Sequence, residues 1–155
     1  MEKIKVKHYT DTFIYSIEQT LKCFKLAAVQ YFNSLNIGTT AEQFIVLDTI
    51  YCNDGICQRD LAKLMLKDKS NINRLINILE ENKFTKRSIG RKQNRLVNQI
   101  FITPKGKKLI EDTMPQVKEF LLSLMEHISA KEIEQVHTLT EKFRKDLMNA
   151  VNFNI

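Results

Sequence analysis

The first third of the chain alternates apolar and polar residues with the period of amphipathic helices. Over residues 10–35 the apolar side chains recur at spacings of three and four, which predicts one long helix. Gly38 is suited to the left-handed conformation that ends such a helix. Thr40 is expected to cap a second helix over residues 41–51. The residues that this second helix should turn inward are Phe44, Ile45, Leu47 and Ile50.

The middle of the chain predicts two shorter helices joined by a charged turn. Residues 56–58 suit a short extended piece, and a third helix is expected over residues 59–66. Residues 67–69 interrupt it, and a fourth helix is expected over residues 70–81. The third helix offers Leu61, Ala62, Leu64 and Met65 for packing. The fourth places Ile72, Leu75, Ile76 and Leu79 on one buried stripe.

The opposite side of the fourth predicted helix consists almost entirely of Asn, Ser and Arg. A face needed only for solubility would favour Glu and Lys, which have better helix propensity than Asn and Ser. Asn and Arg carry donors and acceptors that match the edges of adenine and guanine in the major groove of DNA. The residues expected to contact bases or the groove edge are Ser70, Asn71, Asn73, Arg74 and Asn77.

After Asn82 the pattern changes to that of a strand pair. Residues 84–89 and 96–102 predict two strands, and residues 90–95 between them predict a basic loop without a hydrophobic anchor. The tip of such a ribbon can contact phosphates or enter a minor groove, and the alternative is a plain mobile hairpin. The tip residues concerned are Arg91, Lys92, Asn94 and Arg95.

Two more helices are expected to close the chain. Thr103 and Pro104 begin the first of them, as the cap and the first-turn residue. This helix should run to about Ile128 and bend near Pro115. Residues 129–132 form a capping box that opens the last helix. The apolar residues of the last helix are Ile133, Val136, Leu139, Phe143 and Leu147.

Composition and the distribution of charge indicate which kind of partner this helical chain would bind. The chain has 155 residues, which suits one domain, and its 4 Gly and 2 Pro favour long helices. Residues 56–108 contain 14 Lys or Arg and 4 Asp or Glu, a local charge of +10 within a total of +6. A basic middle between mildly acidic ends indicates a nucleic-acid surface, with a solvated charged face as the alternative.

The remaining totals argue against several other classes of protein. No apolar run resembles a signal peptide or a membrane span, so we expect a soluble cytoplasmic protein without a membrane partner. Gly is scarce and neither a Gly-x-Ser-x-Gly motif nor a P-loop is present, so neither an enzyme nor a cofactor is expected. The three His residues are dispersed and predict no metal site, the weaker alternative being an approach of His127 to His137.

Two runs of residues, in this order of elements, resemble the MarR family of winged helix-turn-helix transcriptional regulators. The run DLAKLMLKDKSNINRLINILEENKFTKR, residues 60–87, resembles that family's supporting helix, charged turn, Ser-x-x-Asn/Thr-Arg recognition helix and following strand. The run QIFITPKGKKLI, residues 99–110, resembles the Leu-Thr-x-x-Gly signature that follows the wing. The resemblance covers roughly residues 10–150.

Three positions depart from the family's pattern. The family's Asp-x-Arg in the wing is matched only in part, so Arg95 or Arg91 must supply the wing-tip contact. Lys83 replaces the family's Gly after the recognition helix, and Asn82 is expected to supply the left-handed turn instead. Cys57 stands where the family usually has a Thr or Ser that caps the third helix.

The resemblance implies a mostly α fold with a small β-ribbon (α+β), a winged helix-turn-helix with N- and C-terminal dimerisation helices. Residues 1–39 and 109–155 would hold the dimerisation helices and residues 40–108 the DNA-binding lobe, within one integrated domain. A homodimer would place two recognition helices in successive major grooves of a near-palindromic double-stranded site, and intramolecular packing is the alternative use of the terminal apolar residues. Phosphate contacts are expected at Arg59, Lys69, Lys86, Arg87 and Lys105.

The implied function is sequence-specific repression, released by an unknown small-molecule effector. Tyr31, Phe32 and Tyr51 are candidates for the effector pocket, with plain core packing as the alternative. Cys23 and Cys57 are candidate redox positions, and inert thiols are the alternative. The rival function is a basic helical module that binds an acidic protein, which a strong salt dependence of duplex binding would exclude.

Overall fold

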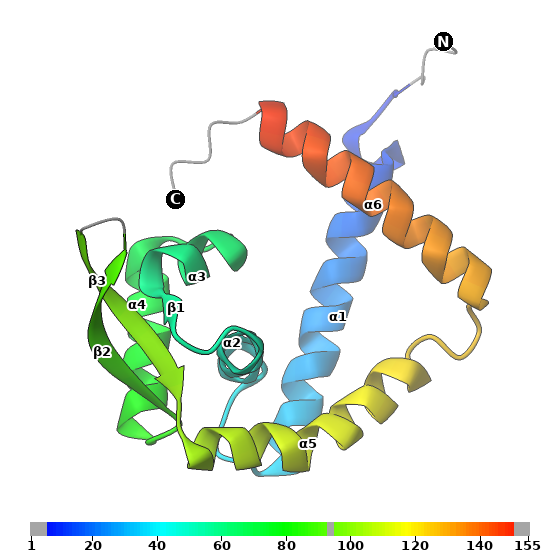
Figure 1. The fold of residues 1–155 in the computed structure, drawn as a ribbon. Helices are drawn as coiled ribbons and strands as arrows, with labels where there is room; N and C mark the ends of the chain where they lie inside the picture. Colours follow the sequence, from blue (N-terminus) through cyan, green and yellow to red (C-terminus); the bar gives the residue numbers. More distant parts are fainter. Residues whose placement is uncertain (1–5, 93–94, 151–155) are drawn as a thin grey trace. The chain divides into compact units, whose positions relative to one another are not determined.

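Residues 6–92 and 95–150 are described by a computed structural model, in which the chain is mostly helical with one small antiparallel sheet (Figure 1). The chain divides into two compact units, residues 1–45 and 46–155. A short 3-10 turn, η1 (Tyr9–Asp11), precedes the first long helix. The mostly α fold with a β-ribbon is therefore confirmed. Within the described residues, no helix is long and apolar enough to cross a membrane.

The first long helix, α1 (Phe13–Leu35), has a polar cap at each end. The Thr12 hydroxyl oxygen accepts a hydrogen bond from the Tyr15 backbone N–H at 3.2 Å, as an N-cap does. At the other end Asn36 adopts the left-handed conformation with φ of 50°. Asn36 is thus the cap that the sequence assigned to Gly38, whose own φ of 72° supplies a second left-handed residue.

The second helix, α2 (Ala41–Cys52), begins after the predicted cap, but the set of residues that it buries differs from the predicted set. Thr40 and Gln43 form a reciprocal pair in which each side chain bonds the other's backbone N–H, at 3.2 and 3.1 Å. Ile45 was expected inward but is 49% exposed. It lies outside the arc of the helix that holds the buried residues, because successive residues are about 100° apart. Those buried residues are Phe44, Val46, Leu47 and Ile50.

A helix-turn-helix follows, with a short strand in front of it. Strand β1 (Ile56–Cys57) leads into α3 (Gln58–Leu64), and α4 (Lys69–Glu81) begins after a turn. Asp68 caps α4, since its Oδ1 accepts the Asn71 backbone N–H at 2.8 Å. The core of this pair is formed by Leu61, Ala62, Ile72, Leu75, Ile76 and Leu79. The buried stripe predicted for the fourth helix is therefore confirmed.

The third helix is shorter than predicted, and the prediction that Leu64 packs inward is wrong. Leu64 is 58% exposed, because it is the last residue of α3 and lies off the stripe formed by Leu61 and Ala62. Leu66 then adopts a left-handed conformation, with φ of 49°, which ends the helix before the turn.

The turn between α4 and the sheet also differs from the expectation. Lys83 itself adopts the left-handed conformation with φ of 62°, whereas Asn82 has φ of −79°. Asn82 instead closes the last turn of α4, where its side-chain amide donates to the Ile78 carbonyl at 2.8 Å. The backbone N–H of Phe84 then bonds the Leu79 carbonyl at 2.8 Å, which satisfies a carbonyl at the helix end.

The sheet has the strand order β1-β3-β2, and its hairpin is longer than predicted. Strands β2 (Thr85–Lys92) and β3 (Arg95–Ile102) pair antiparallel along their whole lengths, from Thr85↔Ile102 to Lys92↔Arg95. Most of the basic loop expected over residues 90–95 is thus strand, because the ladder needs only paired backbone groups and tolerates exposed polar side chains. We call this hairpin, residues 85–102, the wing.

Two helices close the chain. Thr103 caps α5 (Pro104–Ser123), its hydroxyl oxygen accepting the Gly106 backbone N–H at 3.1 Å, and α5 continues through Pro115. It ends at Ser123 and not near Ile128, because i to i+3 hydrogen bonds from Met125 and Ile128 tighten the following turns. The predicted capping box at residues 129–132 then opens α6 (Ala130–Ala150).

The beginning of α5 is bonded closely to residues 82–84, between α4 and β2. The Thr103 hydroxyl donates to the Lys83 carbonyl at 2.7 Å, and the Thr103 backbone N–H donates to the Phe84 carbonyl at 3.0 Å. Gly106 is buried against this turn, where a Cβ would lie 2.3 Å from the Phe84 carbonyl oxygen.

Gly106→Ala is expected to lower the free energy of unfolding by about 1–3 kcal/mol, because a backbone carbonyl must move to admit the methyl group. Lys107→Ala, in the same turn but exposed, is the matched control and should change stability by less than about 0.5 kcal/mol. Urea unfolding at a fixed protein concentration measures both. Equal stability of the two variants would show that the close approach is absent.

Candidate nucleic-acid interface

Helix α4 has an exposed polar side and, opposite it, a buried apolar side. Ile72, Leu75, Ile76 and Leu79 are at most 1% exposed, so the rotation of α4 about its axis is fixed by the core. Asn71 lies half-buried at the edge. The exposed residues, which we call the polar face of α4, are Ser70, Asn73, Arg74 and Asn77.

Side chains on the polar face are held by hydrogen bonds to one another and to the wing. The Arg74 guanidinium donates to Asn71 Oδ1 at 3.2 Å, within α4. The Arg87 guanidinium, from β2, donates to Asn73 Oδ1 at 3.1 Å and to Asn77 Oδ1 at 2.7 Å. The face is therefore organised before any ligand arrives.

Arg87 was expected to contact phosphate, but its guanidinium is directed at α4. It forms an ion pair with Glu80, and the two side chains are 26% and 25% exposed. Sequence reasoning missed Glu80 as its partner. Arg87 lies beyond the end of α4, so helical spacing does not predict the pair; the return of β2 alongside α4 brings the two side chains together.

A hollow of about 440 Å³, lined by residues with polar side chains, lies at the beginning of α3 and α4, beside β3. Three of its residues, Lys69, Ser70 and Asn73, were predicted site residues. Gln58 and Asn98 were not singled out, although Gln58 donates to Asn73 Oδ1 at 3.3 Å. No local pattern in the sequence indicates that a strand residue and a helix-start residue share this hollow.

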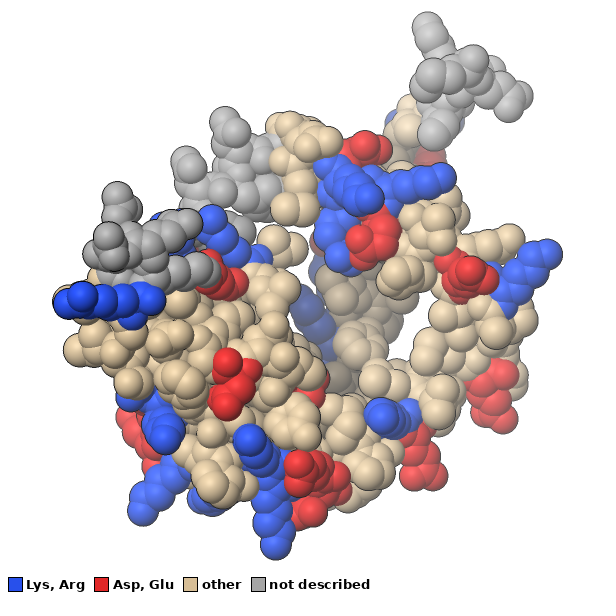
Figure 2. All heavy atoms as spheres, viewed as in Figure 1, with Lys and Arg blue, Asp and Glu red and all other residues tan. Residues whose placement is uncertain are grey.

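The wing carries positive charge toward its tip. In Figure 2 blue basic atoms lie at the tip end of β2 and β3, at the left of the view, beside atoms that are not described. Arg91 is exposed on β2. Lys92 and Arg95 end the two strands, while their side chains and all of Asn94 lie outside the described residues.

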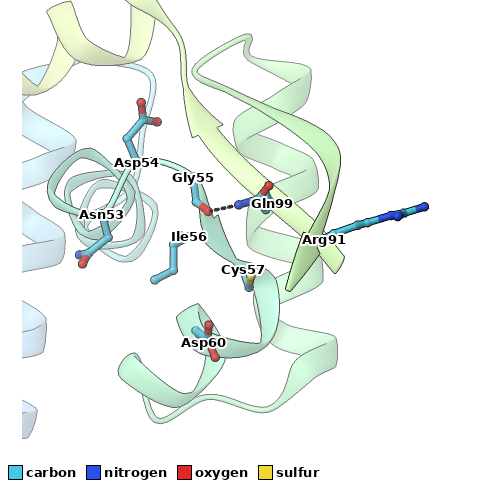
Figure 3. A pocket seen from close by; sticks show the side chains of 8 residues that line it. All are labelled: Asn53, Asp54, Gly55, Ile56, Cys57, Asp60, Arg91 and Gln99. Carbon is cyan, nitrogen blue, oxygen red and sulfur yellow. Dashed lines mark hydrogen bonds between the residues drawn. The ribbon is translucent and has the colours of Figure 1, made fainter. Parts of the chain in front are cut away.

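The inner end of the wing is tied to β1. A hollow of about 440 Å³ lies there. Figure 3 shows that the Arg91 side chain is directed away from the other residues that line it. The Gln99 side chain donates to the Gly55 carbonyl at 3.1 Å, and the backbone N–H of Ile102 donates to Asp54 Oδ1 at 2.8 Å. These bonds fix the base of the wing next to α3.

The other predicted phosphate contacts differ in exposure and in the contacts that they make with the rest of the chain. Arg59, Lys69 and Lys86 are exposed. The Lys105 ammonium donates to the Asn82 carbonyl at 2.9 Å and lies 4.8 Å from the centre of the Phe84 ring.

The candidate effector and redox residues have ordinary surroundings. Phe32 packs on Phe44 with ring centres 5.1 Å apart and is 6% exposed, as a core residue is. The Tyr51 hydroxyl donates to Glu111 at 3.1 Å, and this hydrogen bond raises the pKa of the phenol. Tyr31 is half-buried beside Phe32.

Cys23 is exposed and Cys57 is buried at the start of α3. Among the described residues, no cluster of His, Cys, Asp and Glu could hold a metal ion.

Known proteins are similar to this chain both in the region of the helix-turn-helix and wing and over most of the fold. Residues 39–97 match the model of the MarR family. YybA of Bacillus subtilis (strain 168), an uncharacterised HTH-type transcriptional regulator, is 27% identical over 112 residues, which cover 72% of this chain and 74% of YybA. The S. aureus MepR–DNA complex superposes with a TM-score of 0.76 at 25% identity, covering 91% of this chain and 100% of MepR. A MarR transcriptional regulator from Methanosarcina mazei Go1 gives 0.71 at 26% identity, covering 87% and 96%.

Proposed function

This chain belongs to the MarR family of transcriptional regulators, and we propose that it represses transcription by binding double-stranded DNA as a homodimer. Members of this family are regulators and not enzymes. The observation that carries the proposal is the polar face of α4, whose Asn and Arg side chains stand opposite four fully buried Ile and Leu residues.

The helix-turn-helix and the wing are kinds of element that fit the grooves of a DNA duplex. A single helix fits the major groove, where Asn and Arg can read base edges, and a two-stranded ribbon can contact the adjoining backbone or minor groove. The candidate phosphate contacts Arg59, Lys69 and Lys86 are exposed. The acidic-protein alternative has less support, because the polar face of α4 offers no aromatic anchor. We therefore assign DNA binding to residues 40–108.

Selection from a random duplex library tests this function. The purified protein is expected to enrich a near-palindrome whose half-sites lie about one helical turn apart, which is the spacing of two recognition helices in a dimer. Retention of all duplexes equally, or of none, would contradict sequence-specific binding. A second selection with an acidic polypeptide as competitor separates DNA binding from the acidic-protein alternative.

Arg74→Ala is expected to cost about 1–3 kcal/mol of binding free energy and to relax the preference at one position of each half-site. Lys86→Ala, an exposed candidate phosphate contact, should weaken binding to all sequences evenly. Fluorescence anisotropy with the selected duplex and its single-base variants measures both effects. An Arg74→Ala protein with unchanged affinity and preference would show that α4 does not read the bases.

Dimerisation is proposed for the terminal helices, residues 1–39 and 109–155. No residue of α6 is buried in the single chain, although it carries apolar residues at helical spacing. Val136 is 62% exposed and Leu139 64% exposed. A second copy of the chain would remove such a stripe from water.

Leu139→Glu is therefore expected to shift the protein from dimer to monomer, since it places a charge on the apolar stripe of α6. Thr138→Glu adds the same charge on the opposite side of the helix and should leave the dimer intact. Sedimentation velocity over a range of concentrations distinguishes the two. Two variants with the same sedimentation coefficient would place the subunit interface elsewhere.

Release from DNA is proposed to follow the binding of a small molecule that favours the conformation unable to bind DNA. Tyr31, Phe32 and Tyr51 stay predictions for its pocket. Release by oxidation is the other route, and the exposed Cys23 is better placed to react than the buried Cys57.

A further inference from the structure

We propose that Arg87 sets the hydrogen-bonding polarity of the polar face of α4, so that Asn73 and Asn77 present only donors to DNA. This inference rests on the proposed function. It makes Arg87 a positioning residue that determines specificity without contacting a base.

The chemistry of guanidinium dictates which way the two amides turn. Arg has only N–H donors, so a neighbouring Asn must direct its carbonyl oxygen toward Arg and its NH₂ group away. Arg87 Nη2 meets Asn73 Oδ1 at 3.1 Å and Asn77 Oδ1 at 2.7 Å. One nitrogen therefore orients two side chains that lie one helical turn apart.

The acceptor capacity of Asn73 is used completely. Its Oδ1 also receives the Gln58 side-chain amide at 3.3 Å, and a carbonyl oxygen has two lone pairs. Asn77 Oδ1 has one partner, but that partner is charged and close, which makes the bond strong. Within the described residues, the NH₂ groups of Asn73 and Asn77 have no partner, and both residues are exposed.

The Arg87 guanidinium is held in place from its other side. Its pairing with Glu80 leaves both side chains about one quarter exposed. This pairing offsets the positive charge, so Arg87 is poorly suited to be a phosphate contact and well suited to hold the amides. Glu80 is on α4 and Arg87 on β2, so the orientation of the amides depends on the packing of the wing against α4.

The oriented amides exclude one pairing with DNA. An Asn that reads adenine in the bidentate manner donates to N7 and accepts from the N6 amino group. Asn73 has no remaining acceptor for that amino group. Its NH₂ group matches edges that offer acceptors, which are N7 and O6 of guanine, O4 of thymine, or N7 of adenine alone. We therefore expect guanine or thymine opposite Asn73, and no contact of Asn73 with an adenine N6 amino group.

Library selection with three proteins tests the proposal. Beside the wild type we would use the double variant Glu80→Gln with Arg87→Met, which removes the guanidinium and its counter-charge together, and the neighbouring Lys86→Met as the control. Wild type should select against adenine at one position per half-site by roughly tenfold or more. The double variant should lose most of that discrimination, because the amides are then able to turn. Lys86→Met should bind more weakly with an unchanged consensus.

Base analogues in the selected duplex provide the second measurement. Replacing guanine with 7-deazaguanine at the position opposite Asn73 should weaken wild-type binding; where thymine is selected, 4-deoxythymine has the same effect. Placing nebularine, which lacks the amino group, in place of adenine opposite Asn73 or Asn77 should not weaken it.

The outcomes separate the proposal from the proposed function. If the wild type enriches a palindrome but the double variant retains the same base preferences with a native thermal transition, the role of Arg87 is refuted and DNA binding stands. A loss of wild-type affinity with nebularine opposite Asn73 also refutes it. If wild type enriches no sequence, both fail. If the double variant does not fold, Arg87→Lys takes its place. Lysine keeps the positive charge but has fewer N–H donors for Glu80, Asn73 and Asn77, so this variant should show an intermediate base preference.

Discussion

Binding to the selected duplex is expected to weaken about 10³- to 10⁵-fold when the salt concentration rises from about 50 to about 200 mM. Neutralising each phosphate releases condensed counterions, so the logarithm of affinity falls by about 0.9 per contact for each tenfold increase in salt. Even three contacts in each subunit, for which Arg59, Lys69 and Lys86 are exposed, would give six in a dimer.

The slope of this salt dependence can be tied to a single residue. Arg91→Gln should reduce it by about one contact per subunit, since the exposed side chain is replaced by a neutral one of similar length. Titrations at four or more salt concentrations, with the fold followed by circular dichroism, provide the measurement. An affinity that hardly changes with salt would contradict a duplex-binding surface.

Leu79→Ala is expected to lower the free energy of unfolding by about 2–5 kcal/mol, the usual cost of a cavity left by a buried leucine. Leu79 is fully buried, and its carbonyl also bonds Phe84 at the turn into β2. Glu81→Ala, exposed two residues later on the same helix, should change stability by less than about 0.5 kcal/mol. Denaturant unfolding of the two variants at equal concentration measures the difference. Similar midpoints would mean that the α4 stripe is not packed.

Local patterns in the sequence were sufficient for the helices and for the exposed side of α4. The spacing of Ile72, Leu75, Ile76 and Leu79 determines both the buried stripe and, by exclusion, the polar face of α4. Caps at Thr40 and Thr103 were predictable for a similar reason, because a capping side chain bonds a backbone group only three residues away.

Contacts between distant segments were not predictable in this way. The ion pair of Arg87 with Glu80 and its bonds to two Asn residues depend on how the wing returns along α4. The periodicity also misplaced Ile45 and Leu64, each of which lies just outside the arc that packing buries. Basic residues predicted a loop at residues 90–95, whereas strand pairing continues because it depends on backbone groups.

The bonds between the beginning of α5 and residues 82–84 restrict how α4 can be displaced. They join the C-terminal end of α4 to α5, so a rotation of α5 that keeps these hydrogen bonds would turn α4 with it. A helix of 13 residues is about 20 Å long. A rotation of about 10° would therefore move Ser70, at the N-terminal end of α4, by roughly 3 Å, which exceeds the tolerance of a hydrogen bond to a base.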